Sequence, residues 1–181
     1  MPVSYERCLP DEEIHVMAAN IMQEHHKHLD MGDGSFPRLC ILWASVSAEE
    51  RKEGIPAVKC HGEPAKAVVS IIPYKQRVDK RADAEIIVDK YLWDEMTHRQ
   101  RLALVDHEIT HLEVQKDEDG YLKTDDLGRP KLKLRRHDFC IEGFLVIARR
   151  YGEDSNELIL ARSVQKNFPE ALDVQTGLYA K

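Results

Sequence analysis

The chain has 181 residues, of which 43% are hydrophobic and 32% charged, and a formal net charge of -6. This length suits a single domain with a substantial core, spanning residues 1–181, and the composition excludes intrinsic disorder. The negative net charge argues against binding to nucleic acid or to an anionic membrane through the overall charge of the protein.

The cysteines and the N-terminus indicate a reducing compartment. The four cysteines form no C-x-x-C pair, so we expect reduced, mostly buried thiols and neither a zinc ribbon nor a redox motif. The first sixteen residues lack the apolar segment of a signal peptide, and no apolar run approaches the ~20 residues of a membrane span. We therefore expect a cytoplasmic protein.

The first half of the chain predicts one helix and three strands. Apolar residues recur at helical spacing from Asp11 to Leu29, with acidic residues in the first turn, which indicates an amphipathic helix. Three β-prone runs follow, at Arg38–Val46, Ala67–Ile72 and Ala84–Val88, and we expect them to form one sheet.

A second helix is predicted from Trp93 to Glu113. Leu102, Val105, Ile109 and Leu112 form its apolar stripe. A polar segment from Gln115 to Arg136 then contains turn signals and an alternating K-L-K-L, which predicts a small hairpin.

A last strong helix is predicted to begin near Asp138, a plausible N-cap, and to end before Gly152, which suits a left-handed C-terminal position. Residues 153–181 resemble a short helix and a tail, so the core spans about residues 11–152. This order of elements predicts an α+β fold with a small mixed sheet.

The chemistry is concentrated in D-H-E-I-T-H at residues 106–111, which contains H-E-x-x-H. His107 and His111 lie one helical turn apart, on the same face, and can reach one metal ion. At about 100° per residue they lie roughly 160° from the centre of the apolar stripe, so the helix can pack and still present both rings to a cleft.

Glu108 is the candidate general base. Its offset from both histidines places its carboxylate beside a metal-activated water and not on the metal itself. Zinc lowers the pKa of such a water to about 7, and hydrolysis of an amide bond follows from this arrangement. We therefore predict a hydrolase with one Zn²⁺ and a protein or peptide substrate; a non-peptide amide or ester would suit the same chemistry.

A catalytic zinc usually has three protein ligands. Our first choice for the third is His137, which follows His111 by 26 positions, and the alternative is Glu142. Asp106 and Asp138 are candidates to accept a hydrogen bond from the second nitrogen of a liganding imidazole.

D-H-E-I-T-H, followed by R-R-H-D-F at the start of another helix, resembles the phage metallopeptidase family, itself similar to the SprT-like zincins. The resemblance covers roughly residues 36–152. It implies a zincin fold with an active-site helix, one zinc, His107, His111 and His137 as ligands, and Glu108 as catalytic base. If the chain is encoded by a phage, the cytoplasm would be that of the host cell.

The resemblance also implies a substrate-binding sheet edge, because zincins commonly bind substrate backbone as an added strand. Ala84–Val88 occupies the corresponding place in the order of elements. A catalytically silent zincin-like protein that sequesters a host or phage partner is the alternative function. The basic stretch from Arg129 to Arg136 could contact nucleic acid or an acidic substrate, although solvated hairpin charges explain it more simply.

Overall fold

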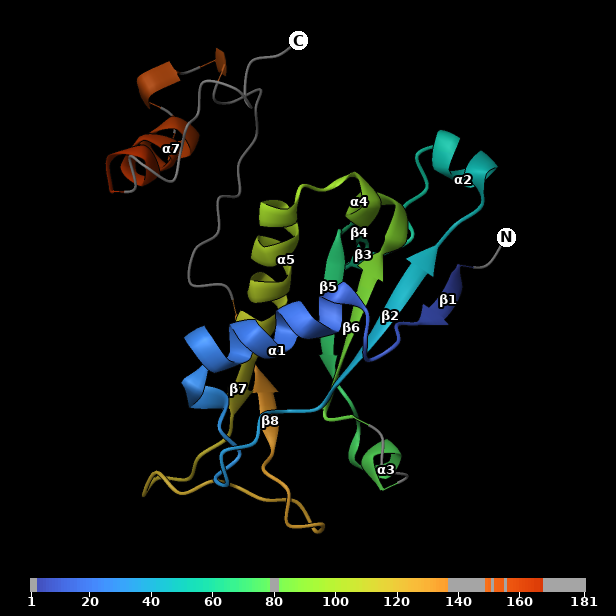
Figure 1. The fold of residues 1–181 in the computed structure, drawn as a ribbon. Helices are drawn as coiled ribbons and strands as arrows, with labels where there is room; N and C mark the ends of the chain where they lie inside the picture. The colour runs from blue at the N-terminus through green and yellow to red at the C-terminus, as the bar shows by residue number, and fades with distance from the viewer. Residues whose placement is uncertain (1–2, 79–81, 137–148, 151, 155, 168–181) are drawn as a thin grey trace. The chain divides into compact units, whose positions relative to one another are not determined.

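A computed structural model describes residues 3–78, 82–136, 149–150, 152–154 and 156–167 (Figure 1). The chain divides into two compact units, residues 1–136 and 137–181. The first unit contains a mixed four-stranded sheet with helices and has the expected α+β character.

The sheet of the first unit has the strand order β1-β2-β6-β5. Its strands are β1 (Ser4–Arg7), β2 (Leu39–Ser45), β6 (Ala84–Asp89) and β5 (Ala67–Ile71). β2 and β6 are parallel, and each edge strand runs antiparallel to its neighbour. The three predicted strands and their common sheet are therefore confirmed, and β1 was missed because its four residues are all exposed and carry no apolar alternation.

The strand order corrects one expectation. Ala84–Val88 belongs to β6, which is paired on both sides and so is not a sheet edge. The edge strand next to the helix that carries the H-E-x-x-H motif is β5. The expectation that Ala84–Val88 forms a sheet edge is therefore wrong.

Helices cover one face of the sheet. They are α1 (Glu13–His25), the 3-10 turn η1 (Lys27–Leu29), α4 (Lys90–Glu95) and α5 (His98–Thr110). Ile14, Met17 and Ile21 of α1 are buried in one core with Val105 and Ile109 of α5 and with the inward-facing residues of the sheet. Figure 1 shows α1 crossing α5 over this face.

The opposite face of the sheet carries a smaller cluster of Ala44, Ala57 and Val58. Short elements lie in the segments between the central strands. They are α2 (Ala48–Lys52), β3 (Lys59–Cys60), β4 (Glu63–Pro64) and α3 (Tyr74–Arg77).

The predicted helix from Trp93 to Glu113 is in fact two helices. Met96 is extended, and Thr97 begins α5 with a capping box in which its side chain accepts from the N–H of Gln100. T-x-x-Q is a capping-box pattern, so the sequence contained the local signal for this break. The helix also ends earlier than predicted, at Thr110 with His111 as its C-cap.

Replacing Thr97 with alanine tests this helix start. The substitution removes the side-chain acceptor of the capping box, and we expect the free energy of unfolding to fall by about 1 kcal/mol. Urea denaturation followed by tryptophan fluorescence measures the change. An unchanged midpoint would show that the cap contributes nothing.

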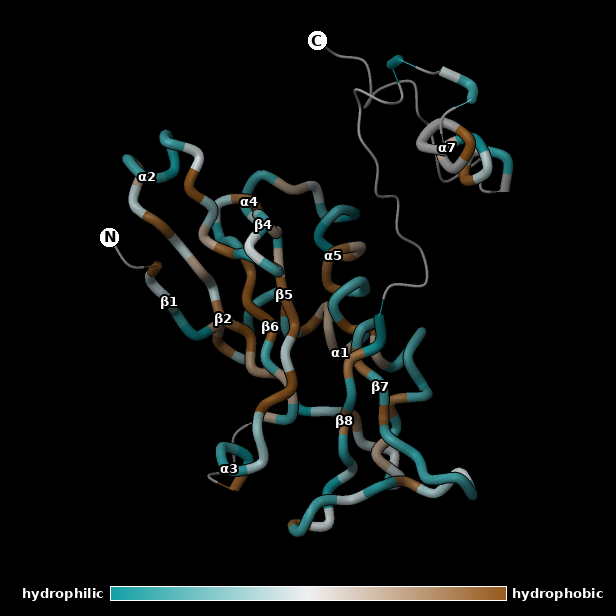
Figure 2. The backbone as a smooth tube through the Cα atoms, turned by 180° about the vertical axis from the view of Figure 1, so that it is seen from behind, coloured by the Kyte–Doolittle hydropathy of each residue, from teal (hydrophilic) through white to brown (hydrophobic). Residues whose placement is uncertain are grey.

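The predicted hairpin is present but begins three residues earlier than expected. β7 (Leu112–Val114) pairs with β8 (Leu132–Leu134) in antiparallel register, so Leu112 lies on a strand and not on the helix. Both Leu112 and Val114 are buried in the main core. Figure 2 shows the long connection between the two strands as largely hydrophilic.

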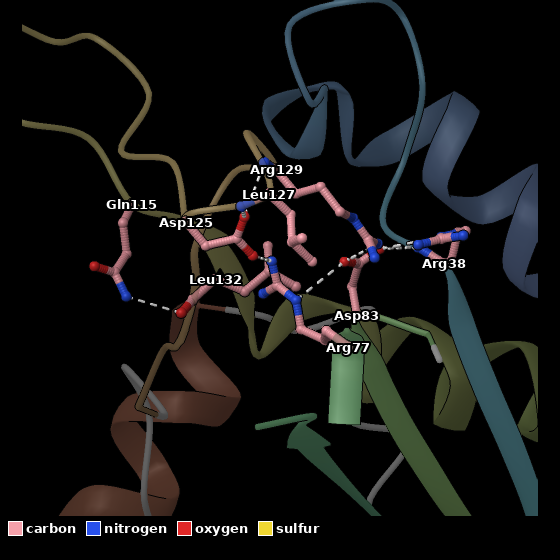
Figure 3. Close-up of polar contacts among 8 residues, drawn as sticks. All are labelled: Arg38, Arg77, Asp83, Gln115, Asp125, Leu127, Arg129 and Leu132. Atoms are coloured by element: carbon pink, nitrogen blue, oxygen red, sulfur yellow. Dashed lines mark hydrogen bonds and ion pairs between the residues drawn. The ribbon is translucent and has the colours of Figure 1, made fainter. Parts of the chain in front are cut away.

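A buried ionic cluster ties this connection to the end of the sheet (Figure 3). Arg77 forms ion pairs with Asp125 and, at 3.8 Å, with Asp83. Asp83 also pairs with Arg129 and accepts a 2.8 Å hydrogen bond from the backbone N–H of Arg38. The side chains of Arg77, Asp83 and Asp125 are each at most 5% exposed, so the cluster anchors the hairpin through desolvated charges.

In the second unit, the structure describes the 3-10 turn η2 (Gly152–Asp154) and the helix α7 (Asn156–Asn167). Gly152 has the predicted left-handed conformation, with φ of 54°. The predicted start of the preceding helix at Asp138 lies outside the described residues. Among the residues described, no helix is both long and apolar enough to cross a membrane.

Candidate metal centre

The motif residues lie in the last turn of α5 and not in the middle of a helix. His107 and Glu108 belong to the helix, and His111 follows it with helical backbone angles (φ -69°, ψ -18°). The motif therefore occupies the junction between α5 and β7. The side chains of α5 and β7, and those of the residues that pack against these two elements, set the geometry of the motif.

The two imidazoles lie side by side. The ring centroids of His107 and His111 are 5.0 Å apart, and the rings are nearly perpendicular, at 84°. Ring nitrogens that share a zinc lie about 2.0–2.1 Å from it, which puts the centroids of two tetrahedrally placed rings on the order of 5 Å apart. The observed pair thus fits two ligands of one zinc ion.

The rotation of α5 explains why the histidines do not enter the core. Val105 and Ile109 are fully buried against the sheet and α1, whereas His107 is exposed and His111 half-buried. Residues two and six positions after Val105 lie on the opposite side of a helix. The prediction that both histidines lie away from the packing face is confirmed.

The hairpin holds the His111 ring. His111 Nδ1 lies 2.8 Å from the backbone carbonyl oxygen of Arg135, and the backbone N–H of Arg135 donates to the carbonyl of His111 at 2.7 Å. A proton on Nδ1 in this hydrogen bond makes Nε2 the ring atom with the lone pair. A backbone carbonyl commonly orients metal-binding histidines in this way.

Glu108 faces the sheet and is nearly buried, with 5% of its surface exposed. Burial raises the pKa of its carboxyl to about 7, against the opposing effects of His111 and of a hydrogen bond with the backbone of Val69. Val69 is the central residue of the edge strand β5. A carboxyl with a pKa near neutrality suits a group that accepts and returns a proton.

Asp106 has a partner other than the one expected. Its Oδ1 lies 2.6 Å from Nε2 of His26, which is buried between α1 and η1. The expectation that Asp106 orients a liganding imidazole is therefore wrong for His111, whose Nδ1 is bonded to Arg135. Instead, Asp106 ties the motif end of α5 to the end of α1.

Sequence reasoning missed three of these neighbours: His26, the carbonyl of Arg135 and the N–H of Val69. The H-H-K-H cluster at residues 25–28 was visible, but which histidine is buried depends on α1 ending at His25. Two of the missed groups are backbone atoms distant in sequence, one on β5 and one directly after β8, for which a sequence contains no side-chain signal.

The two candidate third ligands, His137 and Glu142, lie outside the described residues. So does Asp138, the second candidate acceptor of a hydrogen bond from a liganding imidazole. Within the described part of the chain, no group of three or more His, Cys, Asp or Glu side chains is placed to hold a metal. His107 and His111 are the two candidate ligands that the structure brings together.

H-E-x-x-H on a helix is a pattern typical of metal-dependent hydrolases. The sequence matches the family described as "Putative phage metallopeptidase" over residues 6–167, so the chain belongs to that family. The family implies a metal and a protein substrate. Comparisons with curated proteins and with solved structures gave no match.

Proposed function

We propose that the protein is a zinc-dependent peptidase with a single metal ion bound by His107 and His111 and with Glu108 as the general base. The observation that carries this proposal is the pair of rings 5.0 Å apart, one of them oriented by the Arg135 carbonyl, beside a buried carboxyl. When bound, zinc would polarise the scissile carbonyl and acidify a water molecule.

Glu108 would receive the proton of the attacking water and return it to the leaving amine. Its hydrogen bond with Val69 and its burial restrain the carboxyl group. Proton transfer by such a positioned group contributes typically about 10²–10⁴-fold to the rate.

The edge strand β5 is suited to hold the substrate backbone. The bonds from Asp89 N to Lys66 O and from Ile72 N to Asp83 O show that Lys66 and Ile72 face β6. Because pairing alternates along an antiparallel strand, the peptide groups of Ala67, Val69 and Ile71 face away from β6, where the N–H of Val69 already bonds the Glu108 carboxyl. A substrate added as a strand here would run past the Glu108 carboxylate.

For the third ligand we propose His137, with Glu142 as the alternative. In the sequence, His137 follows Arg135, whose carbonyl accepts from the His111 ring, by two positions. It is therefore the candidate closest along the chain to the described pair.

A metal-exchange experiment tests the proposed function. The purified full chain is analysed for bound metal, and its cleavage of a reduced, denatured protein is followed by gel electrophoresis. We expect about one zinc per chain, loss of cleavage on chelation and recovery on adding one equivalent of zinc. Cleavage that persists after complete removal of metal, or metal-loaded protein that cleaves nothing, would contradict the proposal.

Competitive zinc titration tests the third ligand. His137→Ala is expected to weaken zinc binding by roughly 100-fold or more, because even outer-sphere partners contribute 10- to 100-fold. Glu142→Ala and the exposed control His61→Ala are expected to leave the affinity unchanged. A loss with Glu142→Ala and none with His137→Ala would instead assign the ligand to Glu142.

A further inference from the structure

His26 lies at the joint between α1 and η1 and caps both elements. Its backbone is not helical (φ -117°, ψ 43°), its N–H donates to the Met22 carbonyl at 3.0 Å, and its carbonyl accepts from the N–H of Leu29 at 2.9 Å. His26 is only 6% exposed, whereas its neighbours His25 and His28 are exposed. The fold therefore buries one ring of the H-H-K-H cluster and holds its backbone on both sides.

The ring of His26 contacts the last turn of α5 through Asp106. Its Nε2 lies 2.6 Å from Oδ1 of Asp106, which is 80 positions away in sequence. A carboxylate oxygen only accepts hydrogen bonds, so Nε2 carries a proton and donates. The imidazole side chain is 7% exposed and the carboxylate 44%, so the donor is shielded from water. Hydrogen bonds to ionised groups are roughly twice as strong as those between neutral groups, so this bond is a strong link between α1 and α5.

Asp106 and Glu108 hold the motif turn of α5 from two sides. At about 100° per residue, these two carboxyl groups lie roughly 200° from each other around the helix axis. Glu108 bonds to the backbone of Val69 on β5, whereas Asp106 bonds to His26 at the end of α1. Two bonds on nearly opposite sides of a helix restrain its rotation about the axis more than either bond alone.

The orientation of this turn sets the positions of the two proposed zinc ligands. His107 directly follows Asp106, and His111 lies one position beyond the end of α5. The last carbonyls of a helix lack intrahelical partners, so helix ends fray unless other contacts hold them. The hydrogen bond from Thr110 Oγ1 to the Asp106 carbonyl, at 2.7 Å, closes the turn internally but does not fix how the turn faces the rest of the fold. The bond to His26 does fix it on one side.

We propose that His26 is a positioning residue of the candidate metal centre. Its bond to Asp106 fixes the turn that carries His107 relative to the hairpin, whose Arg135 carbonyl holds the His111 ring. This keeps the two rings at the 5.0 Å separation that suits one zinc ion. Ligand side chains need to be held within about 0.5 Å of the productive geometry. The proposal rests on the zinc-binding part of the proposed function and not on peptide cleavage.

Two substitutions of His26 test the proposal in a competitive zinc titration of the purified full chain. His26→Leu fills the buried site but cannot donate, whereas the side-chain amide in His26→Gln can still donate to Asp106. We expect zinc to bind His26→Leu about tenfold or more weakly, as for other outer-shell partners, and His26→Gln within about threefold of the wild type. His25→Leu, on the neighbouring exposed histidine, is the matched control and should leave the affinity unchanged.

The visible absorption spectrum of the Co²⁺-loaded protein gives a second measurement, because the d–d bands of Co²⁺ depend on the geometry of its ligands. The bands should change in His26→Leu and resemble those of the wild type in His26→Gln. A side chain that only stabilises the fold would leave both the zinc affinity and the spectrum of the folded protein unchanged. Circular dichroism and urea denaturation of the metal-free variants measure that stabilising contribution separately.

Asp106→Ala removes the same bond from its partly exposed end, so the test does not depend on the folding of His26→Leu. It should weaken zinc binding by a similar factor, and its effect should shrink in a variant that also carries His26→Leu, since both remove one bond. Unchanged affinity in Asp106→Ala would overturn the proposal. So would equal losses in His26→Leu and His26→Gln, or fully additive effects of His26→Leu and Asp106→Ala.

The outcomes separate the role of His26 from the peptidase function. Wild-type protein that binds zinc and cleaves nothing would contradict only the peptidase function. Zinc affinity that survives loss of the bond, in a protein that cleaves denatured substrate, would contradict only the role of His26. A wild-type chain that binds neither Zn²⁺ nor Co²⁺ would contradict both.

Discussion

Replacing Glu108 with glutamine is expected to lower the rate of peptide cleavage by about 10²–10⁴-fold, with no loss of zinc. Glutamine keeps the size of the side chain and can still accept a hydrogen bond from Val69, but it cannot take a proton from water. Glutamine is preferred to alanine because Glu108 is only 5% exposed, so that alanine would leave a cavity. A loss of activity in the alanine variant could then not be distinguished from a loss of stability.

The measurement compares kcat/KM, zinc content and urea denaturation for the wild type and Glu108→Gln. Glu118→Gln, in an exposed turn of the hairpin, is the matched control and is expected to retain full activity. Undiminished cleavage by Glu108→Gln would remove Glu108 from the mechanism. A variant that binds a protein partner as well as the wild type, where neither cleaves it, would support the sequestering alternative.

Replacing Arg77 with methionine is expected to destabilise the first unit by about 3–5 kcal/mol, since it leaves a buried carboxylate without its cation. Arg77 and Asp125 are both 5% exposed, and Asp125 also accepts from the backbone N–H groups of Leu127 and Arg129. Without the ion pair between Arg77 and Asp125, the connection that precedes β8 is less firmly fixed. β8 is followed by Arg135, whose carbonyl accepts a hydrogen bond from the His111 ring.

Urea denaturation followed by tryptophan fluorescence measures the loss, because Trp43 and Trp93 are both buried in the first unit. Arg77→Met combined with Asp125→Leu should recover part of the stability, since no buried charge is then left without a partner. The control Lys133→Met breaks an exposed ion pair with Glu113 and should change stability by about 1 kcal/mol or less. A loss as small as that of Lys133→Met would show that the cluster contributes no more than a surface pair.

The effect of Arg77→Met should also depend on pH. Burial by itself would raise the pKa of Asp125, but hydrogen bonds from Arg129 and Leu127 and the charges of Arg77 and Arg129 hold it below its ordinary value. A carboxyl with a lowered pKa contributes stability above its unfolded pKa, and the contribution is lost as the pH falls through its folded pKa. The difference between the wild type and Arg77→Met should therefore be largest near neutrality and shrink in acid.

The sequence by itself determined the elements whose signals are local. Helical spacing predicted α1 and its buried residues Ile14, Met17 and Ile21, and β-prone runs predicted β2, β5 and β6. The H-E-x-x-H spacing predicted that His107 and His111 share a face opposite Val105 and Ile109. These features depend on residues within a few positions of one another, so a periodicity of 3.6 or 2 suffices to predict them.

Only the tertiary structure decided where α5 ends and what surrounds the motif. Leu112 continues the helical stripe in sequence but pairs with Leu134, because a strand partner 22 positions away offers hydrogen bonds that the helix does not. The Arg135 carbonyl on His111, the Val69 backbone on Glu108 and His26 on Asp106 are likewise long-range contacts. Each depends on the register of a strand or the end of a helix, which no local pattern specifies.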